Sequence, residues 1–303
     1  MTRTIWLNGK LLPEERAVVS LYDSAMMYGD AVYTMLRTFN REPFQWEAHE
    51  QRLFRSVDTV GIHPAWLQQL RVSYDELTAA NADAFAADDE IRTVITASRG
   101  PLPLYPHLEP GPWVMICQYP LRWVLRGKSH LYRDGVRAVC TEIEPIPERN
   151  IPFHVKHHNR LHFRLAELDI ASRHGPEAWA LVMLDGCILE ATGANWFTVI
   201  DGVLHTPAVG CLPGISRAFV IRLALRLGIR VREDNWLDLP TEPGSEAFFT
   251  CTPFSIVPCT RINGAPIGDG TPGPITRRLT AAWQGEVDCL FVKQAERWDA
   301  DGV

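Results

Sequence analysis

Four short apolar segments form two strand–turn–strand patterns, and these patterns limit the possible folds more than any other part of the chain. The segments are 178–184, 187–190, 195–200 and 203–205. Asp185-Gly186 joins the first pair and Asp201-Gly202 joins the second. Because Asp-Gly suits the tight turns of β-hairpins, we expect two consecutive hairpins. Glu190 then lies at the end of a central strand, where a carboxylate is seldom buried without a proton donor or a cation, such as a protonated ring nitrogen.

Lys156 lies in a cluster of basic residues. The other members are His154, His157, His158, Arg160, His162 and Arg164. Because neighbouring positive charges disfavour another one, we expect a lowered pKa for Lys156 and a larger fraction of neutral, nucleophilic amine. The alternative is a solvated basic helix end without a catalytic role.

Three leucines after Lys156 recur at helical spacing. Leu161, Leu165 and Leu168 predict a helix over about residues 156–174 with these leucines as its apolar stripe, and Gly175-Pro176 predicts its end. Lys156 would then lie at or just before the first turn. The helix dipole is positive there, which further disfavours a cation.

A second helix start has the pattern of a phosphate-binding site. In Leu212-Pro213-Gly214-Ile215-Ser216, a glycine precedes the helix and a serine falls in its first turn. Free backbone N–H groups, a hydroxyl and the positive dipole end suit a phosphate. Thr252, in Thr250-Cys251-Thr252-Pro253, could add a further hydroxyl. The alternative is an ordinary capped helix.

The first 120 residues predict a smaller α/β domain. Strands are expected at 32–39, 91–97 and 113–119, and helices at 47–60 and 74–86. Arg52 and Arg55 project from the first helix, where arginines are usually solvated. Residues 121–134 are basic and irregular, so we expect them to link this domain to a larger α/β domain over residues 135–303 that carries Lys156.

Composition excludes several classes of protein. The chain has 303 residues and a net charge of −6, which argues against nonspecific binding to nucleic acid. Its seven cysteines lack metal-site spacing, so reduced thiols in a cytoplasm are the simplest account. No apolar run reaches transmembrane length, and we expect no contact with a membrane.

Several motifs in order resemble the class IV aminotransferases, which are pyridoxal-phosphate enzymes of fold type IV. The motifs are Tyr28-Gly-Asp30, His49-Glu-Gln-Arg-Leu53, Lys156-His-His-Asn159, Glu190-Ala-Thr-Gly-Ala-Asn-Trp-Phe197 and Leu212-Pro-Gly-Ile-Ser-Arg217. The family includes branched-chain and D-amino acid aminotransferases and aminodeoxychorismate lyase. The resemblance runs nearly end to end. It implies two α/β domains with the active site between them, and a homodimer or higher homo-oligomer.

The resemblance also implies roles for individual residues. Lys156 would bind pyridoxal 5′-phosphate covalently and later transfer the substrate proton, and Glu190 would pair with the protonated pyridine nitrogen. Four residues would hold the phosphate: Arg52, Ile215, Ser216 and Thr252. The expected reaction moves an amino group between an amino acid, preferably branched-chain, and a 2-oxo acid by a ping-pong mechanism.

Departures from the family patterns leave the subfamily open. Branched-chain enzymes usually carry Glu where this chain has Thr34, and Lys156-His-His-Asn159 is closer to the lyase and D-amino acid branches. The length of the chain and the segment 267–276 favour the branched-chain branch. A lyase that eliminates pyruvate and a D-amino acid aminotransferase remain alternatives. A metal site at His154 and His158 is disfavoured because it lacks an acidic neighbour and a third ligand.

We expect an arginine to bind the substrate carboxylate, because a bidentate guanidinium is the usual way to fix such a group. Three arginines are candidates: Arg37, Arg92 and Arg99. Arg37 is expected on the same strand face as Tyr33, a predicted pocket residue, and is therefore the first choice. Arg92 and Arg99 flank a strand whose end should approach this pocket. The alternative is that all three lie at the surface or in an interface.

Overall fold

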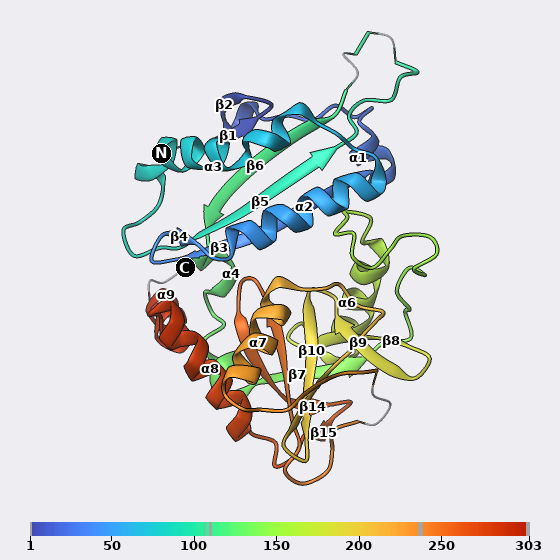
Figure 1. The fold of residues 1–303 in the computed structure, drawn as a ribbon, viewed down its shortest axis with the longest axis vertical. Helices are drawn as coiled ribbons and strands as arrows, with labels where there is room; N and C mark the ends of the chain where they lie inside the picture. Colours follow the sequence, from blue (N-terminus) through green and yellow to red (C-terminus); the bar gives the residue numbers. More distant parts are fainter. Residues whose placement is uncertain (1, 106, 109–110, 236–238, 301–303) are drawn as a thin grey trace. The chain divides into compact units, whose positions relative to one another are not determined.

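The computed structural model describes residues 2–105, 107–108, 111–235 and 239–300. The chain divides into two compact units (Figure 1). The first contains Met1–Val124 and His154–Arg160, and the second contains Leu125–Phe153 and Leu161–Val303. The segment with Lys156 is thus grouped with the first unit, whereas the sequence-based division assigned this lysine to the C-terminal domain. The predicted linker at 121–134 stays a prediction as a domain boundary.

The first unit contains an antiparallel sheet with the strand order β2-β1-β6-β5-β3-β4. Its strands are β1 (Thr4–Leu7), β2 (Lys10–Pro13), β3 (Ala31–Phe39), β4 (Glu42–Pro43), β5 (Ile91–Ser98) and β6 (Trp113–Pro120). Its helices are η1 (Glu14–Arg16), α1 (Ser24–Tyr28), α2 (Trp46–Val60), η2 (Ala65–Gln69), α3 (Leu70–Ala80) and η3 (Ala82–Ala84). Figure 1 shows α2 lying along the sheet.

Helix α2 stabilises this unit through one apolar side. Leu53 and Val57 are fully buried, and each such side chain contributes roughly 1.5–3 kcal/mol. Gly61 ends the helix in the left-handed conformation with φ 67°. The predicted helix at 47–60 and the three predicted strands of this unit are therefore confirmed.

The predicted helix at 74–86 differs from α3, which ends at Ala80. Asn81 explains the difference because its side chain pairs with the backbone of Thr4 in both directions, at 2.8 and 2.9 Å. This pairing ties the end of α3 to β1 and leaves only a short turn of η3 beyond it.

The second unit contains a small barrel. Strands β10, β13, β14, β7, β8 and β9 pair in this order, and β9 pairs again with β10 to close the ring. The strands of the second unit are β7 (Val136–Cys140), β8 (Trp179–Leu184), β9 (Cys187–Ala191), β10 (Ala194–Ile200), β11 (Val203–Thr206), β12 (Val231–Glu233), β13 (Glu246–Cys251), β14 (Ser255–Ile262) and β15 (Ala265–Pro266). Its helices are α5 (His130–Asp134), α6 (Leu161–His174), α7 (Ile215–Arg226), α8 (Pro274–Val287) and α9 (Phe291–Ala300).

Both predicted hairpins are confirmed. Strands β8 and β9 meet at Asp185-Gly186, and β10 and β11 meet at Asp201-Gly202. The φ angles are 50° and 78° in the first turn and 49° and 72° in the second. Positive φ at both central positions is what a type I′ turn requires.

The prediction for the helix after Lys156 is wrong in two respects. Helix α6 begins at Leu161, so Lys156 lies outside it. The predicted stripe is also reversed, because Leu161, Leu165 and Leu168 are 67%, 49% and 50% exposed. The buried side contains Ala166 and Ile170, which pack against Ala180 of β8.

Residues 121–134 were expected to be irregular, but the structure shows two short helices in this segment. These are α4 (Arg122–Leu125) and α5. Arg122 pairs with Asp89 at 2.7 Å, and Tyr132 donates to the carbonyl of Phe254 at 3.2 Å. Each helix is thus fixed to its neighbours. Among the described residues, no helix is long and apolar enough to cross a membrane. Among the described residues, no disulfide bond joins any of the seven cysteines.

Candidate active site

Lys156 lies in an extended segment that pairs with the start of β3. The Tyr33 N–H donates to the Lys156 carbonyl at 2.8 Å, and the His158 N–H donates to the Ala31 carbonyl at 2.9 Å. The Lys156 N–H donates to Ser56 Oγ of α2 at 3.3 Å. Sheet pairing, rather than a helix, therefore fixes the backbone of the lysine. The expected helix-dipole effect on its pKa does not apply at this position.

Aromatic rings lie beside the lysine side chain. Lys156 Nζ is 4.8 Å from the centre of the Tyr33 ring, and the His158 ring stacks on Tyr33 at 4.2 Å. Burial, with the charges of Arg160 and Lys156, lowers the pKa of His158 to about 4. His158 is therefore neutral at pH 7 and adds no positive charge next to Lys156.

Gly29 explains the Tyr28-Gly29-Asp30 motif. It ends α1 with φ 67°, and a Cβ at this position would lie 3.2 Å from Cα of Asn159. A side chain here would be strained and would press on the lysine segment. Asp30 pairs with Arg99 at 2.6 Å. The motif thus places the beginning of β3 against residues 156–159.

Arg52 is buried in the same unit, although arginines on helices are usually solvated. Its side chain contacts Thr34 and His49, two residues that the sequence analysis did not select as site residues. Mainly through burial, the pKa of Arg52 falls to about 10, so the guanidinium remains charged at pH 7. Its Nε has no partner among the described residues. A charge in this situation suits an anionic ligand.

In the second unit, Glu190 lies on β9 opposite Asn195 of β10. Its Oε2 accepts from Asn195 Nδ2 at 3.3 Å and from the Leu212 N–H at 3.4 Å. Asn195 Nδ2 also donates to the Leu212 carbonyl at 2.8 Å. Asn195 therefore links Glu190 to the loop before α7. In the same loop, burial raises the pKa of the Cys211 thiol to about 12, and the nearby charge of Glu190 adds to this effect.

The start of α7 has the features of an anion site. Gly214 is its N-cap, and no described side chain caps this end. The N–H groups of the first turn, including those of Ile215 and Ser216, are therefore available to a ligand. A Cβ on Gly214 would lie 1.9 Å from Asn195 Oδ1, so a side chain here would force Asn195 to move.

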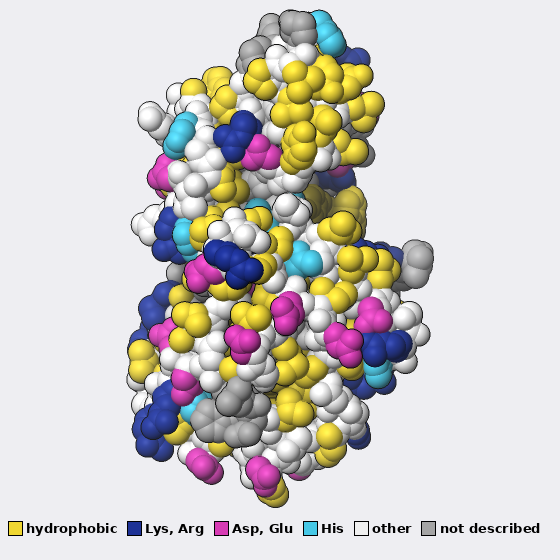
Figure 2. Space-filling model, turned by 90° about the vertical axis from the view of Figure 1, so that its right-hand side faces the viewer, with side chains coloured by type: hydrophobic (Ala, Val, Ile, Leu, Met, Phe, Trp, Pro, Cys, Tyr) yellow, Lys and Arg dark blue, Asp and Glu magenta, His cyan; other side chains and the backbone are white. Residues whose placement is uncertain are grey.

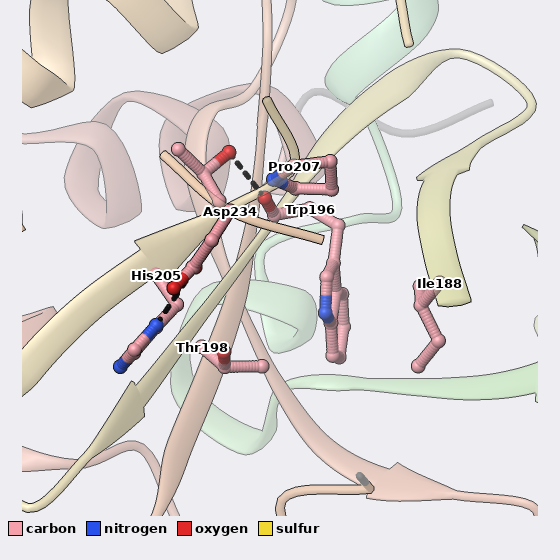
Figure 3. A pocket seen from close by; sticks show the side chains of 7 residues that line it. Ile188, Trp196, Thr198, His205, Pro207 and Asp234 are labelled. Atoms are coloured by element: carbon pink, nitrogen blue, oxygen red, sulfur yellow. Dashed lines mark hydrogen bonds and ion pairs between the residues drawn. The ribbon is translucent and has the colours of Figure 1, made fainter. Parts of the chain in front are cut away.

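Arg217 fixes this helix start to strands β11 and β12. Its Nε donates to Thr206 Oγ1 at 3.1 Å, and its Nη2 donates to the Pro207 carbonyl at 2.7 Å and to Glu233 at 2.8 Å. Thr206 and Pro207 also line a small pocket with His205 and Asp234, which pair at 2.9 Å (Figure 3). This pocket lies beside the anchor of α7.

Thr252 lies in the turn between β13 and β14. Next to this turn, Thr250 pairs in register with Asn195, and its buried Oγ1 has no hydrogen-bond partner among the described residues. The turn therefore begins beside the strand that carries Asn195. The hydroxyl of Thr250 is a further candidate ligand that the sequence analysis did not select.

The three candidate arginines for the substrate have different surroundings. Arg37 is 2% exposed, bonds to the Thr38 carbonyl at 3.1 Å and stacks on Phe39 at 3.9 Å. Arg99 bonds to Asp30 and to the carbonyls of Val60 and Gly61. Arg92 lies 3.0 Å from the sulfur of Met35 and 5.3 Å from the Tyr119 ring. Among the described residues, no carboxylate pairs with Arg92.

The residues present fit pyridoxal phosphate. A buried arginine with an unpartnered Nε, a glycine-capped helix start and an unpartnered buried hydroxyl are donors that a phosphate could use. A lysine amine and a carboxylate provide the remaining groups that this cofactor needs.

Comparisons with known proteins agree with this chemistry. The family model for amino-transferase class IV matches residues 31–262. The chain is 29% identical to the branched-chain-amino-acid aminotransferase of Escherichia coli K12, covering 97% of this chain and 95% of that one. It is 24% identical to D-alanine aminotransferase of Bacillus licheniformis, covering 93% and 96%.

Solved structures are similar over almost the whole chain. The branched-chain aminotransferase of Thermoproteus uzoniensis with norvaline has a TM-score of 0.80 and 27% identity, covering 98% of this chain and 97% of that one. The T.th. branched-chain amino acid aminotransferase with pyridoxamine 5′-phosphate has a TM-score of 0.82 and 25% identity, covering 98% of each. This chain therefore belongs to the class IV aminotransferases, pyridoxal-phosphate enzymes of fold type IV.

Proposed function

We propose that this aminotransferase moves the amino group of a branched-chain amino acid to a 2-oxo acid by a ping-pong mechanism. The observation that carries the substrate class is one face of the first sheet. Met35 pairs with Val94, and Tyr33 pairs through Thr96 with Met115, so these side chains share a face. Met35, Val94 and Met115 are only half-buried. An apolar, partly accessible face next to Lys156 suits an aliphatic side chain.

The roles of the catalytic residues follow from their chemistry. When bound, pyridoxal phosphate supplies an electron-withdrawing ring that weakens the C–H bond of the substrate α-carbon. Lys156 would hold the cofactor and then take and return the α-proton through Nζ. Glu190, held by Asn195 and the Leu212 N–H, would keep the ring nitrogen protonated. Arg52, Ile215, Ser216 and Thr252 would bind the phosphate.

For the substrate carboxylate we now favour Arg92 over Arg37. Arg37 turns toward Phe39, away from Tyr33, and is engaged by the Thr38 carbonyl. Arg92 is the strand partner of Arg37, so both lie on the Tyr33 face of the sheet, but the Arg92 guanidinium contacts Met35, which lies between Arg37 and Tyr33 along β3. A half-buried guanidinium whose neighbours are a thioether and a ring can bind a carboxylate at little cost.

A donor screen tests the proposal. We would mix the holoenzyme with single L- or D-amino acids, follow the cofactor absorption band, and add a 2-oxo acid to reverse the change. We expect leucine, isoleucine and valine to convert the cofactor reversibly. Conversion by D-alanine but not by these donors would instead establish a D-amino acid aminotransferase, an alternative supported by Lys156-His-His-Asn159. Release of pyruvate without amino exchange would establish a lyase.

A further inference from the structure

Two neutral side chains hold Arg52 inside the first unit. Arg52 Nη2 donates to Thr34 Oγ1 at 2.9 Å and lies 3.5 Å from Nδ1 of His49. Thr34 Oγ1 and His49 Nδ1 are themselves 2.9 Å apart. Thr34 is 0% exposed and His49 is 3% exposed, so water competes little for these hydrogen bonds.

The direction of each hydrogen bond follows from Arg52. A guanidinium can only donate, so Thr34 Oγ1 accepts from Arg52, and its own hydrogen can donate to His49 Nδ1. Arg52 Nη2, which also faces His49 Nδ1 and can only donate, favours a neutral imidazole with its Nδ1 unprotonated. Burial, together with the charges of Arg52 and Lys156, lowers the pKa of His49 well below its usual value, which agrees with this assignment.

This arrangement leaves the positive charge of Arg52 without a counter-charge. Among the described residues, no carboxylate lies within ion-pair distance of the guanidinium, and the buried Nε has no acceptor. Burying a cation without a counter-charge costs several kcal/mol. An anionic group on the ligand would offset this cost and satisfy Nε.

We propose that Thr34 and His49 are positioning residues that hold Arg52 in the orientation needed for the cofactor phosphate. This inference rests on the proposed role of Arg52. Thr34 fixes Nη2 without neutralising it, and His49 fixes the Thr34 hydroxyl. The full charge of Arg52 therefore remains directed to the phosphate. An acceptor-free side chain at position 34 would release the guanidinium into other orientations.

The test compares two ligands that differ only in the phosphate. Dissociation constants for pyridoxal phosphate and for unphosphorylated pyridoxal would be measured with the wild-type chain and with Thr34→Val, Thr34→Ser and Thr93→Val. Valine has the shape of threonine but no hydroxyl, whereas serine keeps it. Thr93 is also fully buried and lies on the same face of the sheet, so it is a matched control.

We expect Thr34→Val to weaken binding of pyridoxal phosphate about tenfold, which corresponds to about 1.4 kcal/mol, and to leave pyridoxal binding unchanged. Thr34→Ser and Thr93→Val should bind both ligands like the wild type. The ³¹P signal of the bound phosphate should shift only in Thr34→Val. If Thr34→Val does not fold, Thr34→Ala replaces it.

Two results would overturn the inference. One is wild-type affinity for pyridoxal phosphate in Thr34→Val. The other is an equal loss for both ligands, which would show a purely structural role. Failure of the proposed role for Arg52 is visible separately, because Arg52→Gln would then keep the wild-type ratio of the dissociation constants for pyridoxal and pyridoxal phosphate.

Discussion

Lys156 is defined by its strand pairing to β3, by the Tyr33 ring and by neutral His158. Replacing it tests its role directly. Borohydride treatment of the wild-type holoenzyme should attach the cofactor permanently to Lys156, as peptide mass spectrometry would show. Lys156→Ala should give no such adduct. An adduct of equal stoichiometry in the variant would assign the attachment to another lysine.

The choice between Arg92 and Arg37 can be made from Michaelis constants. Arg92→Lys keeps the charge but loses the bidentate fork, so the constants for donor and acceptor should both rise about tenfold. Arg37→Lys should leave them unchanged and lower the melting temperature, because Arg37 is buried against Phe39. The reverse pattern in steady-state kinetics would return the role to Arg37.

His49 makes stability depend on pH. Its pKa is lowered in the folded chain, chiefly by burial, so below about pH 6.5 the unfolded chain binds the additional proton. Stability should therefore fall as the pH falls below 6.5, by at most about 1.4 kcal/mol per pH unit from this group. The lowered pKa of His158 acts in the same direction, but His158 is exposed, so water screens its effect on stability.

Urea unfolding at pH 7.5, 6.5 and 5.5 measures this dependence. His49→Asn keeps a neutral acceptor near the position of Nδ1 and cannot be protonated. Its stability should fall less steeply than that of the wild type. Parallel curves for the two proteins would show that His49 does not contribute.

At the scale of elements, the start of α7 and strand β10 depend on each other through Gly214 and Asn195. Gly214→Ala should lower the free energy of unfolding by about 1–3 kcal/mol, because its Cβ would lie 1.9 Å from Asn195 Oδ1. Adding Asn195→Ala removes that oxygen, so the double variant should lose less than the sum of the two single losses.

The control for this cycle is Gly285→Ala in α8. A Cβ there has no neighbour within 4 Å, so this variant should be as stable as the wild type or slightly more stable. Additive losses in the Gly214 and Asn195 cycle, measured by denaturant unfolding, would contradict the proposed contact.

At the scale of the whole molecule, the first unit exposes several apolar side chains in the segment 18–28. The large apolar side chains at its surface include Val18, Leu21, Met26 and Tyr28, each more than 60% exposed. On the face drawn in Figure 2, hydrophobic side chains gather near the top of the view. Exposed apolar areas of this kind are typical of interfaces. The segment is therefore a candidate surface for the predicted homodimer.

Light scattering tests this prediction. The wild type should have at least twice the chain mass of 34.2 kDa. Leu21→Glu with Met26→Glu should shift it toward the monomer, because charges would be buried in the interface. Leu225→Glu, at an exposed apolar position on α7, is the control and should keep the wild-type mass. A wild-type monomer would refute the predicted dimer. The cytoplasmic location also stays a prediction.

The sequence alone determined the hairpins at Asp185-Gly186 and Asp201-Gly202, helix α2 and the strands around it, because these depend on local turn chemistry and periodicity. It also determined the family, because the motifs occur in a fixed order. Only the tertiary structure decided the surroundings of Lys156: sheet pairing to β3 stops the predicted helix from reaching it. Burial likewise brought Arg52, Thr34 and His49 into one hydrogen-bond network. Arg37 contacts Phe39 and Arg92 contacts Met35, and these contacts distinguish two arginines that periodicity alone could not distinguish. Long-range packing sets these features, and local sequence does not encode it.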